Sequence, residues 1–195
     1  MTKTDTRQKM IVAAAAMFQE KGYKATTWRA LVDAADVPWG SVKHHFPGGK
    51  AELCICAINY SADLVSNMLS HYLNKADTAA EGVQQWFAKV ATLLKISEYS
   101  SGCPLATLAL ETSAESEEFL SANAKSFARW RSLIANRLKK DQIPTAMANS
   151  LSSVIISAFE GAILQSKLQR STKPMLVASD FMVTLISHSH KTSVA

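Results

Sequence analysis

The sequence predicts an all-α fold, and three observations lead to this prediction. The 195 residues include only seven Gly and five Pro, too few for a strand-rich fold with many tight turns. Apolar residues recur at the spacing of helix faces, and no stretch alternates with period two for long enough to form a strand. Hydrophobic residues make up 48% and charged residues 19% of the chain, which is typical of a folded globular protein.

The first fifty residues predict three helices that form a small head. The first covers Thr6–Gly22, carries one apolar stripe and stops at its glycine. Thr26 and Thr27 offer an N-cap for a second helix over Trp28–Ala35, which Asp36-Val37-Pro38 ends. The third helix covers Trp39–Phe46 and stops at Pro47-Gly48-Gly49, because Pro cannot continue a helix and Gly tolerates positive φ.

The remaining residues, 51–195, predict a larger helical body. The expected helices are Lys50–Tyr72, Ala79–Ile96, Leu105–Leu110, Glu115–Lys140, Thr145–Gln169 and Met175–His188. Pro144 and Pro174 stand near the first turns of the last two, where proline is tolerated. Ser, Gly and Pro residues interrupt the helical pattern between Ser97 and Pro104.

Charge is distributed unevenly along the chain. Residues 1–50 hold eight Lys or Arg against four Asp or Glu, whereas residues 51–195 hold thirteen against twelve. A basic head on a nearly neutral body favours a polyanionic partner, and an ordinary solvated basic surface is the alternative. The N-terminus lacks an apolar signal segment, and no stretch approaches the roughly 18 apolar residues of a membrane span. We therefore expect a cytoplasmic protein with no membrane partner.

The sequence lacks the common catalytic motifs. It contains no P-loop, GxGxxG, HExxH or GxSxG pattern. Its three cysteines, Cys54, Cys56 and Cys103, include no CxxC pair, which argues against a disulfide framework and against a zinc site. We expect no enzyme activity, no cofactor and no metal, and a helical enzyme that acts through Cys103 is the alternative.

The second and third helices of the head have the outline of a helix-turn-helix, in which the second helix enters the major groove of DNA. The side chains of this segment divide as that role requires. Trp39, Ser41, Lys43, His44 and His45 are polar, aromatic or basic, whereas Val37, Val42 and Phe46 are apolar. Many helical proteins contain three short helices, so the outline alone leaves the function open.

From Thr26 to Lys50 the residue types resemble, in order, the DNA-binding head of the TetR family of transcriptional repressors. The preceding helix, with its Lys21-Gly22-Tyr23 exit, fits this resemblance too. Residues 102–111 resemble the LmrA- and YxaF-like regulators of that family. The resemblance implies a helix-turn-helix DNA-binding domain in residues 1–50 and a ligand-binding and dimerisation domain in residues 51–195. It also implies a homodimeric repressor that binds a pseudo-palindromic operator.

The resemblance also implies a set of DNA contacts. They are Thr27, Arg29, Trp39, Gly40, Ser41, Lys43, His44, His45 and Lys50. Gly40 would let the backbone approach DNA, and Lys50 opens a helix whose N–H groups attract phosphate. The family usually has Tyr where this chain has Lys43. Because Lys can reach a phosphate as a point charge, we still expect DNA binding. The change means that no operator sequence known for the family is assumed for this chain. As alternatives, Trp39 staples the head, one of the two histidines is structural, and Lys50 is merely solvated.

In the body, the resemblance implies a pocket for a small apolar or aromatic effector that releases the repressor. The candidate ligand contacts are Trp86, Phe87, Cys103, Leu105, Leu108, Phe127, Trp130 and Phe159, and ordinary core packing is the alternative for each. The last two helices, over about residues 145–188, carry small residues four apart, Ser157 with Gly161 and Ala158 with Ala162. The resemblance implies that these helices form the homodimer interface. An all-helical small-molecule or protein binding module without DNA function is the second hypothesis.

Overall fold

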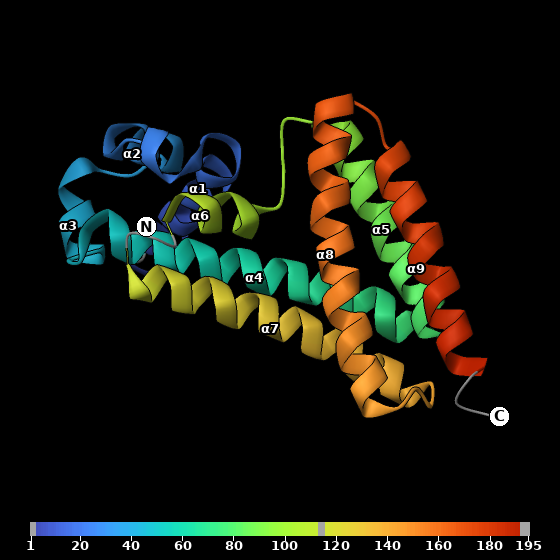
Figure 1. Cartoon of the computed structure of the whole chain (residues 1–195). Helices are drawn as coiled ribbons and strands as arrows, with labels where there is room; N and C mark the ends of the chain where they lie inside the picture. The colour runs from blue at the N-terminus through green and yellow to red at the C-terminus, as the bar shows by residue number, and fades with distance from the viewer. Residues whose placement is uncertain (1–2, 113–115, 192–195) are drawn as a thin grey trace. The chain divides into compact units, whose positions relative to one another are not determined.

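Helices form all the regular secondary structure that the described residues contain. The computed structural model describes residues 3–112 and 116–191, and no strand occurs within these ranges (Figure 1). The helices are α1 (Lys3–Ala25), α2 (Trp28–Ala35), the 3-10 helix η1 (Trp39–Ser41), α3 (Val42–His45), α4 (Gly49–Lys75), α5 (Ala79–Ile96), α6 (Pro104–Thr112), α7 (Glu117–Lys140), α8 (Thr145–Gln169) and α9 (Lys173–Lys191). The prediction of an all-α fold is confirmed.

For several helices, the bounds predicted from the sequence agree with the structure at both ends. The observed bounds of α2, α5 and α8 coincide with the predicted ones. Gly22 interrupts α1 with φ 81° and ψ 172°, where the first predicted helix was expected to stop, although one more turn follows it. The predicted start of α7 at Glu115 lies outside the described residues, and the described helix begins at Glu117.

The prediction of one helix over Trp39–Phe46 was wrong. A 3-10 turn, η1, comes first, and a single α-helical turn, α3, follows it. The cause lies at Ser41, whose N–H and hydroxyl both donate to the carbonyl of Pro38, at 3.0 and 2.6 Å. This i to i+3 bonding tightens the first turn, and a segment this short has too few hydrogen bonds to enforce regular α-geometry.

The chain divides into two compact units. Unit 1 contains Met1–Leu64 and Cys103–Ser126, and unit 2 contains Val65–Gly102 and Phe127–Ala195. The division falls within α4 and within α7. In unit 1, α1 packs against both α2 and α6 (Figure 1). Met10 and Phe18 of α1 and Leu31 of α2 are completely buried there, so apolar burial fixes the supporting helix against the helix-turn-helix.

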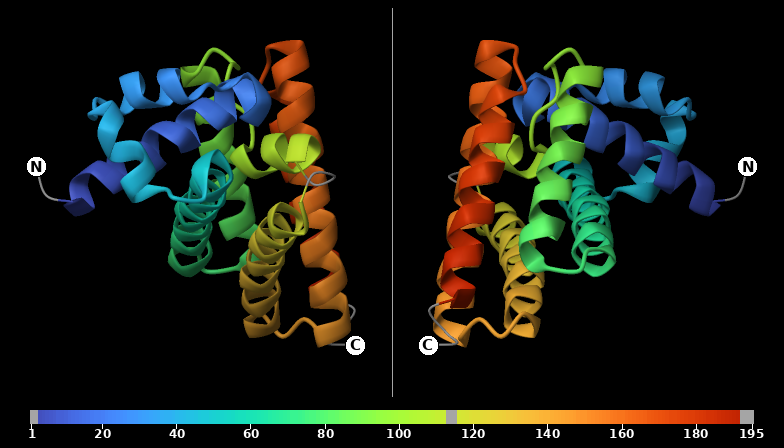
Figure 2. Two further views of the ribbon diagram at one scale, coloured as in Figure 1. Left: turned by 90° about the vertical axis from the view of Figure 1, so that its left-hand side faces the viewer. Right: turned by 90° about the vertical axis from the view of Figure 1, so that its right-hand side faces the viewer.

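In unit 2, α5 and α8 both pack against α9, and α5 also contacts α8 (Figure 2). Its core contains the fully buried indoles of Trp86 and Trp130. By length and composition, α8 is the one described helix that is long and apolar enough to cross a membrane, and 44% of its most apolar window is buried inside the protein. Core helices of soluble proteins meet the same length and composition criteria, so α8 is weak evidence for a membrane span.

Candidate DNA-binding site

The first helix of the helix-turn-helix is closed at both ends by local hydrogen bonds. Thr27 has extended backbone angles, and its hydroxyl accepts a hydrogen bond from the N–H of Ala30 at 3.2 Å. At the other end, Asp36 adopts the left-handed conformation with φ 50°, and its N–H bonds back to Asp33. These two ends define α2 and set the direction in which the chain enters the next helix.

The second element, η1 with α3, presents its polar and aromatic residues outward. Trp39 is 61% exposed, which is unusual for the largest apolar side chain in an otherwise well-packed head. Lys43 and His44 are also exposed, and the rings of His44 and His45 lie 5.4 Å apart. Phe46, the residue directly after α3, is 1% exposed and anchors the end of the segment in the core. No residue of η1 or α3 itself is buried, and Val42, which the sequence placed inward, is half-buried. The exposed Trp39, Lys43 and His44 form the free face of the segment.

A shallow groove of about 310 Å³ lies beside this free face. Its lining residues are Trp28, Trp39, Val42, Lys43, Phe46, Pro47 and Gly49. Two indole rings and an ammonium group thus border one depression. At Gly40, a Cβ atom would meet nothing within 4 Å, so open space lies in front of this backbone.

Six of the nine predicted DNA contacts are exposed, and three are half-buried. The exposed ones are Thr27, Arg29, Trp39, Gly40, Lys43 and His44, and the half-buried ones are Ser41, His45 and Lys50. The ammonium of Lys50 donates to the carbonyl of Tyr23 at 2.5 Å and lies 4.2 Å from the centroid of its ring. Lys50 therefore helps to hold the end of α1, a role that its place at a helix start did not reveal.

Comparison with known families identifies the two halves of the chain. Residues 10–55 match the family described as bacterial regulatory proteins of the tetR family. Residues 79–181, more than half of the chain, match the C-terminal domain of LmrA/YxaF-like transcriptional regulators. The chain belongs to the TetR family of transcriptional regulators. The protein is thus a transcriptional regulator with a DNA-binding helix-turn-helix, and not an enzyme.

Relatives of this TetR-family regulator match it over nearly the whole chain. The uncharacterized regulator YxaF of Bacillus subtilis is 30% identical over 95% of this chain and 97% of its own. A TetR regulator from Chloroflexus aurantiacus superimposes with a TM-score of 0.83 at 21% identity, over 95% of this chain and 96% of its own. A cysteine mutant of CifR in complex with 26-bp operator DNA gives a TM-score of 0.76 at 20% identity, over 90% and 94%. The fold is therefore shared over at least 90% of the chain.

The predicted ligand contacts of this TetR-family regulator fall into separate groups. In unit 2, the rings of Trp86 and Phe159 stack with centroids 4.0 Å apart, and Phe87 meets Phe159 edge-on at 5.2 Å. Phe127 and Trp130 form a second pair at 5.1 Å. In unit 1, Cys103, Leu105 and Leu108 are all buried. The indole Nε1 of Trp86 is buried without a hydrogen-bond partner, which is costly for a core residue and marks this aromatic group as a candidate ligand contact.

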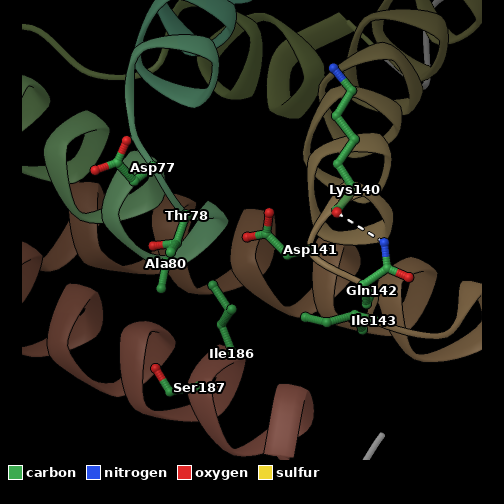
Figure 3. A pocket seen from close by; sticks show the side chains of 9 residues that line it. All are labelled: Asp77, Thr78, Ala80, Lys140, Asp141, Gln142, Ile143, Ile186 and Ser187. Atoms are coloured by element: carbon green, nitrogen blue, oxygen red, sulfur yellow. Dashed lines mark hydrogen bonds between the residues drawn. The ribbon is translucent and has the colours of Figure 1, made fainter. Parts of the chain in front are cut away.

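A cavity of about 500 Å³ lies elsewhere in unit 2 and includes none of the predicted ligand contacts. Figure 3 shows its lining, which comes from the α4–α5 connection with the start of α5, the end of α7 with the α7–α8 connection, and α9. Asp141 points toward this space, and its carboxylate accepts from the N–H of Ala79 at 2.5 Å. That bond satisfies an N–H group at the start of α5, so the carboxylate of Asp141 has a structural role.

The sequence patterns missed several contacts within unit 1. Arg7 of α1 stacks over the ring of Phe46 at 5.2 Å and also approaches the Sγ atom of Cys56 at 3.1 Å. Trp28 lines the groove beside Trp39. Glu111 of α6 accepts hydrogen bonds from the backbone of Tyr23 and Lys24. The sequence did contain an indication for Glu111, because this charged residue directly follows the mostly apolar stretch Leu105–Leu110.

Proposed function

We propose that the chain is a homodimeric repressor that binds a pseudo-palindromic operator and leaves it when a small apolar or aromatic effector enters the body. The observation that carries the DNA part is the free face of η1 and α3. Trp39, Lys43 and His44 are exposed there, on the second helix of a helix-turn-helix within a net basic head. A helix with this placement reads the major groove, while its basic neighbours contact phosphates. The operator-bound CifR, which shares the fold, supports this proposal.

Each candidate contact has a role in this proposal. Lys43 and Arg29 are the exposed cations for phosphate, whereas Trp39 and His44 are placed to meet base edges. The open space at Gly40 admits a close backbone approach to DNA. Thr27, Ser41 and His45 lie at or beside the same elements and are secondary candidates. Lys50 contributes a positive charge next to the start of α4, in addition to its bond with Tyr23.

The proposed dimer interface is the exposed face of α8 and α9. Exposed apolar residues recur along α8 at Met147, Val154, Leu164 and Leu168, and along α9 at Leu176, Val177, Phe181 and Leu185. Leu168 is 77% and Phe181 69% exposed, and a row of exposed apolar side chains along a helix is typical of an interaction surface. Gly161 lies in the same stripe of α8, since it is seven residues from both Val154 and Leu168. A Cβ atom there would meet nothing within 4 Å.

This face explains how two heads would reach one operator. A two-fold axis through paired α8 and α9 helices presents one recognition segment on each side. The two segments would have to lie about 34–36 Å apart to enter successive major grooves. An effector that binds better to a dimer with another head separation lowers DNA affinity by its differential affinity for the two states. The proposed division of labour is DNA binding in residues 1–50 and effector binding and dimerisation in residues 51–195.

The effector would bind among the aromatic side chains of the body. Trp86, Phe87 and Phe159, with Phe127 and Trp130, provide the apolar surface, and the unpaired Nε1 of Trp86 offers one hydrogen-bond donor. Cys103, Leu105 and Leu108 are the further candidates at and near α6. As a DNA-binding regulator without a membrane partner, the protein would act in the cytoplasm.

Selection of bound fragments from a random DNA pool, followed by gel-shift titration, tests this function. We expect an inverted repeat whose half-site centres are about one helical turn apart and a complex of one dimer with one site. Binding that does not enrich any sequence, or a monomer in light scattering at micromolar concentration, would contradict the proposal.

A further inference from the structure

The corner between α1 and α2 is held by a carboxylate from a distant helix. Glu111 Oε2 accepts from the N–H of Tyr23 at 2.8 Å and from the N–H of Lys24 at 3.2 Å. These N–H groups lie just beyond Gly22, where α1 breaks. Hydrogen bonds to an ionised acceptor are roughly twice as strong as neutral ones, so one side chain of α6 fixes two consecutive peptides of the head.

Two features of the structure favour glycine at position 22. A Cβ atom at Gly22 would overlap Glu111 Oε1 unless that carboxylate left its hydrogen bonds, and the φ of 81° at this position disfavours any other residue. Gly22 thus makes room for Glu111 as well as forming the break in the helix. The two residues form one structural feature, although they stand on different helices.

Two further hydrogen bonds and two ring contacts hold the same corner. Lys50 of α4 donates to the carbonyl of Tyr23, and the hydroxyl of the buried Thr26 donates to the carbonyl of Gly22 at 2.7 Å. The Tyr23 ring packs on Phe18 and on Phe119, each at 5.6 Å. The N-cap residue of α2 follows directly after Thr26. A corner held on all these sides leaves α2 little freedom to move independently of α6.

The position of Glu111 on α6 indicates that its charge does not stabilise that helix. Glu111 lies in the last turn of α6, where the helix dipole disfavours a negative charge. It follows an apolar stretch in which Leu105 and Leu108 are buried. A carboxylate at this end therefore has a tertiary role, and its hydrogen bonds supply one.

From these contacts we propose that Glu111 is the positioning residue through which α6 sets the orientation of the DNA-binding head. The consequence for DNA rests on the proposed function, whereas the hydrogen-bonded corner does not. A shift of α6 changes the two bonds to Tyr23 and Lys24 and hence the direction in which α2 leaves the corner. Loss of Glu111 broadens the orientations of the head without removing any phosphate contact. DNA affinity then falls while its salt dependence stays the same.

Hydrogen exchange of the full-length protein tests the corner directly. In Glu111→Ala we expect the amides of Tyr23 and Lys24 to exchange about ten- to a hundredfold faster, as the loss of a hydrogen bond to a charged acceptor predicts. Glu111→Gln keeps one acceptor oxygen and should give a smaller increase. Glu117→Ala, which removes an exposed carboxylate of the same unit, is the matched control and should leave both amides unchanged. Unchanged exchange in both Glu111 variants would overturn the proposal.

DNA binding tests the consequence, with a site selected from a random pool by the wild-type protein. Glu111→Ala should bind several-fold more weakly with an unchanged slope of log affinity against log salt, and Glu111→Gln should recover part of the loss. Gly22→Ala should reproduce the loss of DNA affinity. In the Glu111→Ala protein the same substitution should reduce the affinity by a smaller factor, because the carboxylate that a Cβ atom would displace is already absent. Faster exchange with wild-type affinity would refute the positioning role. Failure of the wild type to bind DNA would instead refute the proposed function, and the exchange result would still decide the corner.

Discussion

Arg137 and Asp141 form an ion pair at the end of α7, and both also bind the backbone around the α4–α5 connection. The guanidinium of Arg137 donates to the carbonyls of Leu73 and Asp77, at 2.9 and 2.8 Å. Asp141 accepts from the N–H of Ala79, the first residue of α5. One pair of charges thus joins three helices of unit 2.

This pair predicts a large stability effect. With side chains only 12% and 15% exposed, replacing Arg137 with Ala leaves a poorly solvated carboxylate and several unpaired carbonyls. We expect Arg137→Ala to lower the free energy of unfolding by about 3 kcal/mol, measured by denaturant titration. Lys139→Ala, an exposed change on the same helix, should cost less than about 0.5 kcal/mol. Equal effects of the two variants would show that the pair contributes little.

The second prediction separates affinity from specificity in the head. Lys43→Ala should weaken DNA binding about equally across sequences and reduce the salt slope by about one unit per lost contact, because a bound cation displaces condensed counterions. Trp39→Ala or His44→Ala should instead change which sequences are enriched, since base-edge contacts carry specificity. Gel shifts at several salt concentrations measure the first effect and repeated selection the second. A Lys43→Ala protein with an unaltered slope would remove Lys43 from the phosphate contacts.

Lys50→Ala gives the third prediction, which follows from its two roles. If Lys50 also approaches a phosphate, the variant should show a reduced salt slope. Because its ammonium also bonds to the carbonyl of Tyr23, the variant should in addition unfold at a lower temperature than Lys43→Ala. Thermal unfolding and salt titration of both variants distinguish the roles. Loss of stability with an unchanged slope would make Lys50 purely structural.

The fourth prediction concerns the dimer. Gly161→Leu adds a bulky side chain to the middle of the exposed stripe of α8, where the single chain has open space. The monomer should therefore fold normally and gain helix propensity, whereas the paired helices are pushed apart and the dimer dissociates at higher concentration. Light scattering over a dilution series measures this. Ala88→Leu, on the exposed face of α5, is the control and should leave the dimer intact. Unchanged association in Gly161→Leu would place the interface on another surface.

The fifth prediction follows from the buried thiol of Cys54. Burial raises its pKa from an ordinary value of 9.0 to about 12, an effect that Glu111 adds to and Lys50 opposes. The folded state thus favours the protonated thiol, so its contribution to stability is complete below about pH 9 and is lost as pH rises toward 12. Between about pH 9 and pH 12, the free energy of unfolding of Cys54→Ala should fall less steeply than that of the wild type, by up to about 1.4 kcal/mol per pH unit. Denaturant titration at several pH values measures both slopes. A variant whose stability falls as steeply as that of the wild type would contradict this.

Local sequence was enough to predict most of the helices and the outline of the helix-turn-helix. Thr27 caps α2 through a bond that spans three residues, and Ser41 bonds to Pro38 over the same distance. Gly22 was recognisable as a stop because a glycine interrupts an apolar periodicity. Of the apolar residues expected to face inward, Val37 and Phe46 are buried, whereas Val42 is half-buried and lines the groove. All these features depend on residues within one or two turns of one another, so their signals lie together in the sequence.

Only the tertiary structure decided which residues meet across the chain. Glu111 reaches the backbone of Tyr23 from 88 residues away, and Lys50 turns its ammonium to the same peptide from 27 residues away. The sequence analysis named Trp86 and Phe159 as candidate ligand contacts, but it did not predict that their rings stack. The physical reason is that a helix hydrogen-bonds to itself over four residues, whereas the packing of apolar faces chooses the partner helix and its register. Polar side chains such as Glu111 then bind whatever backbone groups that packing brings within reach.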